Sequence, residues 1–392
     1  MTSNVGAGEG SPALPSSQDQ GTEAQATTGP DGSPPADLVA WGWDEAWAAT
    51  FSPVAAAGLT PARVIAQHRG QWIIATGRGE ASASLTGRFR HEAEPGDLPA
   101  VGDWVGCVAS LHDGQTRIDA ILPRRSTFLR RAAGPRLGVQ VLAANVDVIF
   151  VATSLNGDLN PRRLERYVST GRESGAEPVV LLTKADLSDD GDARAAGLSD
   201  ELRVPVVALS TRSGQGMRTI ARWFEAGRTL ALVGSSGVGK STLLNRLAGE
   251  QLMVTREIRD DDSRGRHTTS HRELFRLPGG ALMLDTPGMR ELGLWGTEVG
   301  VDETFADLVE LAARCRFADC SHRLEPGCAI RAAVSAGRVD ERRLRSYRRL
   351  SHEVAEQPSI AARHARERHF GNAIRRAAAD SISRKEYRGQ DS

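Results

Sequence analysis

The sequence predicts a multi-domain protein with an N-terminal OB-fold β-barrel, a central α/β domain on a parallel sheet and a C-terminal α-helical domain. Three observations predict it: short strand patterns over residues 62–128, nearly continuous apolar runs between 138 and 297, and a cysteine cluster at 315–328. Short, continuous apolar runs are typical of strands buried on both faces of a parallel sheet. A length of 392 residues fits two or three domains.

Composition excludes several classes of protein. Apolar residues make up 40% and charged residues 25% of the chain, which is ordinary for a globular protein. No run of 18 apolar residues occurs, so we expect no membrane span. The N-terminus lacks the pattern of a secretory signal, and four cysteines are too few for a disulfide framework, so we expect a reducing cytoplasm.

The formal net charge of zero hides an asymmetry along the chain. Residues 1–62 contain seven acidic residues and no Lys or Arg, whereas residues 341–388 contain thirteen basic and six acidic residues. The basic end is therefore a candidate for contact with an anionic partner.

Residues 1–37 are rich in Gly, Ser, Pro, Ala, Thr and Gln, so we expect a disordered tail. An aromatic group follows at Trp41, Trp43, Trp47 and Phe51. We interpret it as a short helix packed on the next domain, with an aromatic contact for RNA bases as the alternative.

The barrel is predicted from five strand patterns with turn residues between them. Five strands in under 70 residues suggest an OB-fold, here over 38–130. The strands are expected at Arg63–Ala66, Gln71–Ala75, Ala83–Phe89, Asp103–Val108 and Arg117–Ile121. Six arginines (Arg88, Arg90, Arg124, Arg125, Arg130 and Arg131) would make one face cationic and RNA-binding, although a solvated face explains isolated arginines equally well.

Residues 138–297 read as a doubly wound α/β domain. Helical spacing over Pro161–Glu173 and Lys240–Ala248 separates some of the apolar runs. The strands are expected at Val146–Ala152, Pro178–Leu182, Pro205–Leu209, Thr229–Val233 and Ala281–Leu284.

The strongest motif is a complete P-loop, G-x-x-x-x-G-K-[ST], between a predicted strand and a predicted helix. It reads Gly234, Ser235, Ser236, Gly237, Val238, Gly239, Lys240 and Ser241, followed by Thr242. Its backbone N–H groups and the helix N-terminus suit phosphate oxygens. Lys240 would reach the β- and γ-phosphates, and Ser241 would ligate Mg²⁺; these two are the leading catalytic candidates.

A D-x-x-G motif ends the last predicted strand at Asp285 and Gly288. Asp285 would hold Mg²⁺ through a water, and the Gly288 N–H would meet the γ-phosphate. The polar loop between the two motifs offers Thr268 or Thr269 as a further Mg²⁺ ligand.

Guanine is the expected base. Thr183, Lys184, Ala185 and Asp186 match [NT]-K-x-D at the end of one strand, and Ser210 and Thr211 follow the next. A carboxylate accepts two hydrogen bonds from guanine that adenine does not supply. Because this pair of motifs precedes the P-loop, the sequence predicts a circularly permuted α/β P-loop GTPase domain.

A metal site is predicted after the GTPase motifs. The spacing Cys315-x₄-Cys320-x-His322-x₅-Cys328 offers three thiolates and one imidazole. That set suits one closed, structural zinc ion. Residues 298–392 are therefore expected to form a zinc-binding, helical C-terminal domain, and Cys107 is expected to be a core residue.

From about Trp41 onward, the permuted motifs, the preceding barrel and the zinc spacing resemble the family of ribosome small subunit-dependent GTPases, RsgA or YjeQ. The resemblance implies GTP hydrolysis that the small subunit stimulates, a role late in 30S maturation, and contact with 16S rRNA by a monomer. His267 is, by resemblance, a candidate for positioning water, because Met289 follows Gly288 where Ras-like enzymes have Gln. Thr183 replaces a common Asn, which predicts a weaker bond to the P-loop.

Three other readings remain open from the sequence. One is a permuted GTPase of large-subunit assembly, which the barrel and the zinc spacing disfavour. Another is a non-enzymatic adaptor that binds GTP or GDP and RNA, which the complete P-loop and Asp285 disfavour. The last is a P-loop kinase or ATPase.

Overall fold

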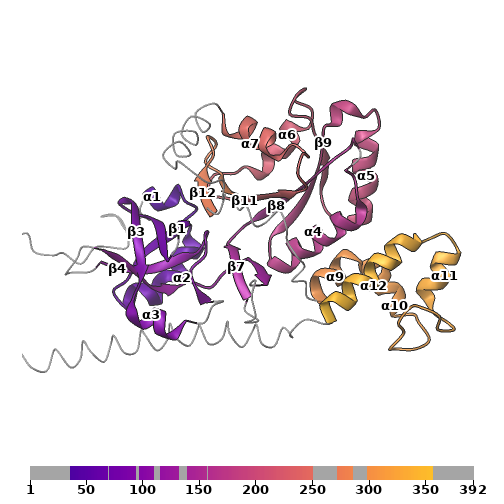
Figure 1. The fold of residues 1–392 in the computed structure, drawn as a ribbon, viewed down its shortest axis with the longest axis horizontal. Coiled ribbons are helices and arrows are strands. Elements are labelled where there is room, and N and C mark those ends of the chain that lie inside the picture. The colour runs from indigo at the N-terminus through magenta and orange to yellow at the C-terminus, as the bar shows by residue number, and fades with distance from the viewer. Residues whose placement is uncertain are drawn as a thin grey trace, which may run out of the picture.

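The computed structural model describes residues 36–68, 70–93, 97–109, 115–131, 139–156, 158–249, 272–285 and 298–355. The predicted tail and most of the basic end therefore lie outside the described residues. A barrel, a sheet covered by helices and a helical C-terminal unit follow one another along the chain (Figure 1). Within these ranges, none of the helices combines the length and apolar character needed to cross a membrane.

The N-terminal strands close into a barrel of OB type. The pairing runs β1–β2–β3–β5–β4 and returns to β1, with β3 and β5 parallel and the other pairs antiparallel. The strands are β1 (Thr60–His68), β2 (Gln71–Thr76), β3 (Gly79–Leu85), β4 (Trp104–Ala109) and β5 (Thr116–Ile121). This closure confirms the predicted five-stranded barrel.

The aromatic group before the barrel belongs to its core. After the short α1 (Ala36–Val39), helix α2 (Glu45–Ala56) begins at Asp44, whose side chain accepts from the Trp47 N–H at 2.7 Å. Phe51 is 2% exposed, and the Trp43 ring meets the edge of Trp104 with centroids 4.8 Å apart. The helical interpretation is confirmed, and the burial of these rings excludes stacking on RNA bases.

One predicted strand was too long. Strand β3 ends at Leu85, and Phe89 lies in a helix, α3 (Gly87–Glu92). The reason is local: Thr86 caps this helix by accepting from the Phe89 N–H at 3.2 Å. The Phe89 ring still reaches the barrel core, which is why the apolar pattern continued past the strand.

The central sheet has the predicted parallel strands in the order β10–β9–β8–β11–β13. They are β8 (Val148–Ser154), β9 (Glu177–Thr183), β10 (Val206–Ala208), β11 (Thr229–Gly234) and β13 (Leu282–Asp285). Every residue of β8 is buried, as expected for a strand covered on both faces.

Helices cover both faces of this sheet. Ile149 and Val151 of β8 share a core with α4 (Pro161–Ser174) and α5 (Gly191–Leu202). The alternate residues Val148 and Phe150 share a second core with helices of the other face. Those are α6 (Met217–Ile220), η3 (Ala221–Trp223) and α7 (Lys240–Ala248). The doubly wound fold is confirmed.

Three strands were not predicted. β12 (Arg272–Arg276) runs antiparallel to β13 and also pairs with β1, so barrel and parallel sheet form one eleven-stranded sheet. β6 (Thr127–Arg131) and β7 (Val139–Ala144) form a separate pair. At the same junction the buried Arg63 donates to the Thr229 hydroxyl at 2.7 Å and to the Trp41 carbonyl.

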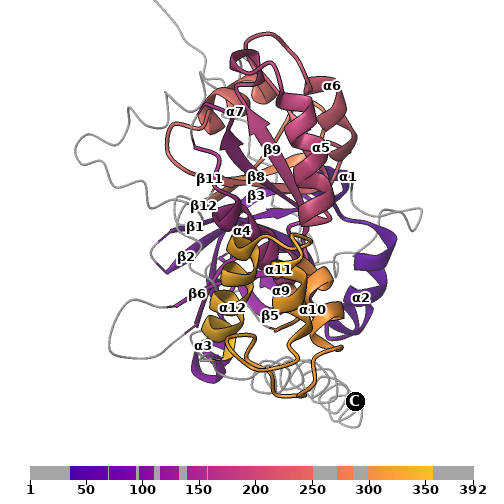
Figure 2. The same ribbon diagram turned by 90° about the vertical axis from the view of Figure 1, so that its right-hand side faces the viewer.

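The C-terminal unit has its own apolar core, built around Phe305, Ile330, Leu344 and Leu350. It consists of α9 (Glu298–Thr304), α10 (Ala306–Ala312), α11 (Ala329–Ser335) and α12 (Glu341–Ala355). Figure 2 shows these helices below α4 of the sheet domain, against which α9 and α12 pack.

Candidate nucleotide site and metal centre

The parallel sheet brings the sequence motifs to one edge. Strands β9, β10, β11 and β13 run in the same direction, so their carboxyl ends meet there. The T-K-A-D loop follows β9, Ser210 and Thr211 follow β10, the P-loop follows β11, and Asp285 is the last residue of β13. This edge is where doubly wound sheets bind ligands.

The P-loop needs each of its glycines for a backbone reason. Gly234 has φ +140°, and a Cβ there would lie 2.1 Å from the Ala152 carbonyl oxygen of β8. Gly237 and Gly239 have φ of +78° and +99°, where side chains are strained. The loop then enters α7 at Lys240, so its backbone N–H groups and the helix N-terminus can face an anion.

The polar side chains of the P-loop lie at this helix start. The Lys240 ammonium donates to the carbonyl of Gly234 at 2.8 Å and to that of Ser235. Ser241 and Thr242 are exposed in the first turn of α7, whereas Val238 is buried and anchors the loop. The arrangement leaves one cation and two hydroxyls at the mouth of an anion-binding helix terminus.

The two loops expected to read the base are tied together. Lys184 has φ +59° and turns the chain into a short 3-10 helix, η2 (Ala185–Leu187). The Ala185 N–H donates to the Leu209 carbonyl at 3.1 Å, which joins the end of β9 to the end of β10. The buried Ser210 hydroxyl accepts from the N–H groups of Arg212 and Ser213. Asp186 is exposed at this edge.

Thr183 links the base-reading loop to the P-loop. Its hydroxyl lies 2.5 Å from the Val238 carbonyl oxygen and 3.1 Å from that of Thr153. Thr183 is 3% exposed, so both contacts are screened from water. The sequence predicted a weaker bond to the P-loop because Thr183 replaces a common Asn. The structure keeps this bond, since the Thr183 hydroxyl donates to a carbonyl of the P-loop.

Several predicted site residues lie outside the described residues. They are the water-positioning candidate His267, the magnesium candidates Thr268 and Thr269, and Gly288 with its neighbour Met289.

Three thiols and one imidazole converge in the C-terminal unit. The ligand atoms of Cys315, Cys320, His322 and Cys328 all lie within 4.8 Å of one another. The sulfurs of Cys315 and Cys328 are 3.9 Å apart, and each lies 3.5–3.6 Å from Nδ1 of His322. Bonds of about 2.3 Å in a tetrahedron place sulfurs about 3.8 Å apart, so these residues fit one tetrahedral metal ion.

The local environment tunes these ligands. Burial lowers the pKa of His322, which favours the neutral ring that a metal requires. Burial raises the pKa of Cys315, but hydrogen bonds from the Ala329 and Ile330 N–H groups and from the neighbouring thiols outweigh it and lower the pKa overall. Burial and the neighbouring sulfurs raise the pKa of Cys320 to about 11, so this thiol needs a cation to ionise at neutral pH.

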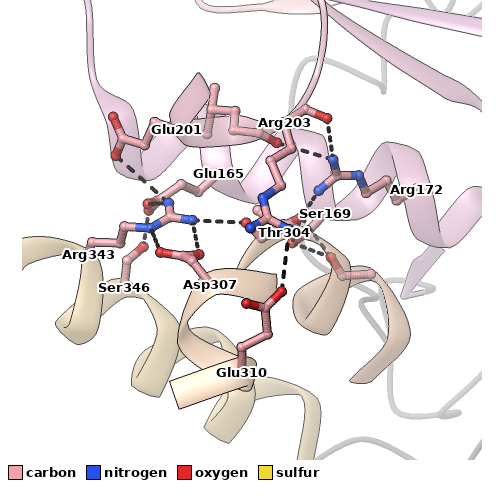
Figure 3. A network of polar contacts seen from close by, with 12 residues as sticks. Glu165, Ser169, Arg172, Glu201, Arg203, Thr304, Asp307, Glu310, Arg343 and Ser346 are labelled. Carbon is pink, nitrogen blue, oxygen red and sulfur yellow. Dashed lines mark hydrogen bonds and ion pairs between the residues drawn. The ribbon is translucent and has the colours of Figure 1, made fainter. Parts of the chain in front are cut away.

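A polar network joins the sheet domain to the C-terminal unit (Figure 3). Arg343 of α12 donates to Glu165 of α4 at 3.2 Å, to both oxygens of Asp307 at 2.7 and 3.1 Å, and to the Thr304 carbonyl. The Ser346 hydroxyl donates to the other oxygen of Glu165. The side chain of Glu165 is only 2% exposed and that of Arg343 8%, so this is a buried ion pair between two units.

Close backbone packing accompanies the network. The Ser169 hydroxyl of α4 donates to the Gly300 carbonyl of α9 at 3.1 Å, and a Cβ on Gly300 would lie 2.5 Å from the Ser169 carbonyl oxygen. Arg172 donates to the Thr304 hydroxyl at 3.0 Å. The sequence analysis did not predict this contact between the two units. One sequence signal could have indicated it: Glu165 and Arg343 are each next to a leucine that faces the core.

The cationic face predicted for the barrel is only partly present. Arg88 pairs with Asp119, Arg124 forms two bonds to Asp103, and Arg125 pairs with Asp44. Arg125 also covers the ring of Trp47 at 4.0 Å. Arg124 is a structural ion pair, since its side chain is 16% exposed and that of Asp103 is fully buried, so the expectation was wrong for Arg124. Arg88 and Arg125 keep 46% and 45% of their side chains exposed, and for them the RNA-binding face stays a prediction.

The sheet, the P-loop and the base-reading loop that precedes it define the chain as a P-loop GTPase of permuted order. Two solved structures of about 24% identity share this fold. YjeQ from Thermotoga maritima has a TM-score of 0.56 over 76% of this chain and 99% of its own. YloQ, described as a circularly permuted GTPase, has a TM-score of 0.54 over 77% and 97%.

Sequence relatives identify the family. The RsgA GTPase family model matches residues 121–295. The small ribosomal subunit biogenesis GTPase RsgA of Opitutus terrae is 48% identical over 333 residues, 81% of this chain and 90% of that protein. The protein of that name from Streptomyces coelicolor is 44% identical over 81% of this chain and 86% of its own. The chain belongs to the RsgA family.

Proposed function

We propose that this protein hydrolyses GTP as a late assembly factor of the small (30S) ribosomal subunit, in the cytoplasm. The names of the relatives support the role in assembly. GTP hydrolysis is supported by the edge of the sheet at which the nucleotide motifs meet. There a P-loop and a guanine-type loop meet through the Thr183 contact with Val238.

In the proposed site each P-loop residue has a chemical role. Lys240 exchanges its carbonyl partners for phosphate oxygens and stabilises charge on the transferring phosphoryl group. Ser241 and Asp285 are the residues that would hold Mg²⁺, which would neutralise charge on the phosphates. The N–H groups of residues 234–242 cradle the phosphates.

Guanine is proposed as the base because Asp186 is a carboxylate at the mouth of the base-reading loop. It would accept from N1–H and N2–H₂ of guanine, while the stem of Lys184 packs on the base. Thr211 would offer its backbone N–H to the guanine oxygen, while the Ser210 N–H donates to the Gln215 carbonyl at 3.0 Å and holds this loop in place. ATP would leave the carboxylate unpaired, which disfavours adenine.

The metal of the C-terminal unit is proposed to be one structural Zn²⁺. Four protein ligands at tetrahedral spacing leave no position for a reacting water. The ion would hold the two loops that flank it in one conformation, and 16S rRNA is the proposed partner of this unit. The exposed arginines of α12 support that partner: Arg342 and Arg345 lie on one side of the helix.

The D-x-x-G loop connects the nucleotide to this unit. Residues 289–297 join Gly288 to α9, which is docked on α4. A γ-phosphate that orders the loop would thus bias the pose of the C-terminal unit. By linkage, the nucleotide that raises affinity for 30S is itself bound more tightly on 30S, by the same factor.

The test is the GTPase rate of the full chain with added 30S, 50S or 70S particles. We expect stimulation by 30S and no turnover in Lys240→Ala. Stimulation by 50S alone would indicate large-subunit assembly, and single-turnover hydrolysis at the background rate with 30S present would indicate a nucleotide-binding adaptor. Competition by ATP as strong as by GDP would overturn the base assignment.

A second measurement addresses the coupling. The affinity for 30S is compared between the states bound to GDP and to a non-hydrolysable GTP analogue, at one fixed salt and Mg²⁺ concentration. We expect tighter binding with the analogue. Equal affinities would show that the nucleotide does not reach the ribosome-binding surface.

A further inference from the structure

The loop between the third and fourth metal ligands folds around a carboxylate of its own. The Glu325 carboxylate accepts from the backbone N–H groups of Ser321, Arg323 and Leu324 at 2.9, 2.8 and 3.0 Å, and from the Ser321 hydroxyl. One oxygen takes both bonds from Ser321, and the other takes those from Arg323 and Leu324. The Ser321 hydroxyl and the backbone N–H groups of the loop lower the pKa of Glu325 to about 2, so the carboxylate is ionised at neutral pH. Hydrogen bonds to an ionised acceptor are stronger than those between neutral groups.

The donors converge on Glu325 because the backbone turns sharply at His322. His322 has φ +56°, in the left-handed region that residues other than glycine seldom adopt. The N–H groups on either side of it, those of Ser321 and Arg323, both donate to Glu325. Concave arrangements of backbone N–H groups bind anions, and here the anion belongs to the same loop. The bonds to Glu325 therefore maintain a backbone conformation that is unfavourable for a histidine by itself.

The backbone of this segment has little else to hold it. Within the described residues, Glu325 is the acceptor for three of the four N–H groups from Ser321 to Leu324, and the fourth, that of His322, donates to the Cys320 sulfur. The far end of the loop is held separately, since the Arg316 N–H donates to the Gly327 carbonyl at 3.1 Å.

Two of the four metal ligands depend on this loop. Cys328 is the N-cap of α11, and the Cys315 N–H donates to the last residue of α10, so helices place these two. Cys320 and His322 lie between the helices, in a segment without helix or strand. Nδ1 of His322 nevertheless lies 3.5–3.6 Å from the sulfurs of Cys315 and Cys328, and the ligand atoms of all four residues lie within 4.8 Å of one another.

We propose that Glu325 is a positioning residue of the metal centre, which holds the loop of Cys320 and His322 so that both ligands face the same ion as Cys315 and Cys328. Groups that orient metal ligands without touching the metal typically contribute 10- to 100-fold in metal affinity. They do so because part of the cost of ordering the ligands is met before the ion binds. The inference rests on the proposed zinc ion and adds the residue that aligns two of its ligands.

Glu325→Gln is the sharpest change, because it keeps the length of the side chain and one acceptor oxygen. The other oxygen becomes an amide group, which donates and cannot accept, so it would face the N–H groups that the carboxylate now binds. The matched control is Asp319→Asn, which removes an equal charge beside Cys320. Asp319 is exposed and takes no part in the bonds between Glu325 and its loop.

The experiment measures the affinity of the full chain for Zn²⁺ by competition with a chromophoric chelator. Glu325→Gln should weaken Zn²⁺ binding by roughly 10- to 100-fold. In the metal-saturated chain, the amides of Ser321, Arg323 and Leu324 should exchange at least about tenfold faster in this variant, because their acceptor is lost. The d–d bands of Co²⁺ bound in place of Zn²⁺ report the coordination geometry and should shift in Glu325→Gln. Asp319→Asn should match wild type in all three measurements.

The outcomes separate this role from the metal centre itself. Equal Zn²⁺ affinities of wild type and Glu325→Gln would overturn the positioning role and leave the metal centre in place. A loss in Asp319→Asn as large as that in Glu325→Gln would show that negative charge rather than position supports the ion, and an unchanged Co²⁺ spectrum would show that the ligands are aligned without Glu325; either result overturns the inference. A wild-type chain that binds no zinc would overturn the proposed centre and, with it, the inference.

Discussion

Replacing Arg343 by Met should loosen the C-terminal unit from the sheet domain. Arg343 is the one described group that donates to Glu165, Asp307 and the Thr304 carbonyl together. Without it, Glu165 keeps only the Ser346 hydroxyl and faces Glu201, whose carboxylate lies 3.8 Å from the same guanidinium. Methionine fills most of the volume, so the loss is mainly one of charge.

The magnitude follows from burial. Removing one partner of a buried ion pair costs about 3–5 kcal/mol, because a charge stays behind without compensation. Glu165→Gln should cost less, about 1–2 kcal/mol, since Arg343 keeps both bonds to Asp307. In the double variant, Arg343→Met with Glu165→Gln, no buried charge is stranded, because Asp307 and Glu201 are each 37% exposed, so its cost should fall well below the sum.

The loss should depend on pH. Burial raises the pKa of Glu165 to about 7, above the ordinary value of 4.5, although Ser346 and Arg343 oppose the shift. The folded state thus binds this proton more tightly, and stability falls as pH rises from about 4.5 to 7. Arg343→Met should extend that fall to higher pH, because without the guanidinium the folded-state pKa of Glu165 rises further. Glu165→Gln should remove the fall.

The assay is native-state hydrogen exchange of amides in α9 and α12. A loss of 3 kcal/mol corresponds to a protection factor reduced by about 150-fold. Amides of β8 serve as the internal control and should keep their protection. A change of less than tenfold in Arg343→Met at pH 8, or additive effects in the double variant, would refute the buried-pair reasoning.

Three further variants test the nucleotide site and the metal centre. Thr183→Val keeps the shape of the side chain but removes the hydroxyl that donates to the Val238 carbonyl. Losing this one buried hydrogen bond should lower GTP affinity by about tenfold, measured by titration with fluorescent GTP. An unchanged affinity would show that this bond does not support the nucleotide site. Asp186→Asn should weaken GTP binding and favour xanthosine triphosphate, and intact GTP affinity would dismiss the base assignment. Cys320→Ser should release the metal and unfold residues 315–328 locally without changing GTP affinity, and metal analysis that finds no zinc in wild type would contradict the site.

The sequence predicted the parts of this fold that rest on local pattern. Buried parallel strands and P-loop glycines have strong one-dimensional signatures, so β8 and α7 were placed to within two residues. Strand β12 was not predicted, because its five residues do not alternate regularly between polar and apolar. Its partner β1 is also distant in sequence. Phe89 was misassigned because a barrel-core ring on a short helix continues the apolar alternation of a strand.

The contact around Arg343, between the sheet domain and the C-terminal unit, could not be predicted from the sequence for a different reason. The sequence does not distinguish a buried Arg or Glu from an exposed one. Arg343 and Glu165 are also 178 residues apart, so no local pattern links them. The same holds for Arg124, which sequence clustering grouped with a cationic face and which the fold pairs with the buried Asp103. Charge counts predict partners only for side chains that the fold leaves exposed.

The packing of the three units indicates which of them can move. Barrel residues such as Trp104 share one apolar core with Ile149 of the parallel sheet, and β1 pairs directly with β12, so these two units are continuous. The C-terminal core around Phe305 is a separate apolar cluster, joined to α4 mainly by ion pairs and close backbone contacts. Apolar burial stabilises an interface in proportion to its area. A buried ion pair adds little net stability, because removing the two charges from water offsets their attraction, and it chiefly fixes the relative position of the two surfaces. The C-terminal unit is therefore the part that can change its pose against the sheet domain without breaking a shared apolar core, and the barrel is the part that follows the sheet.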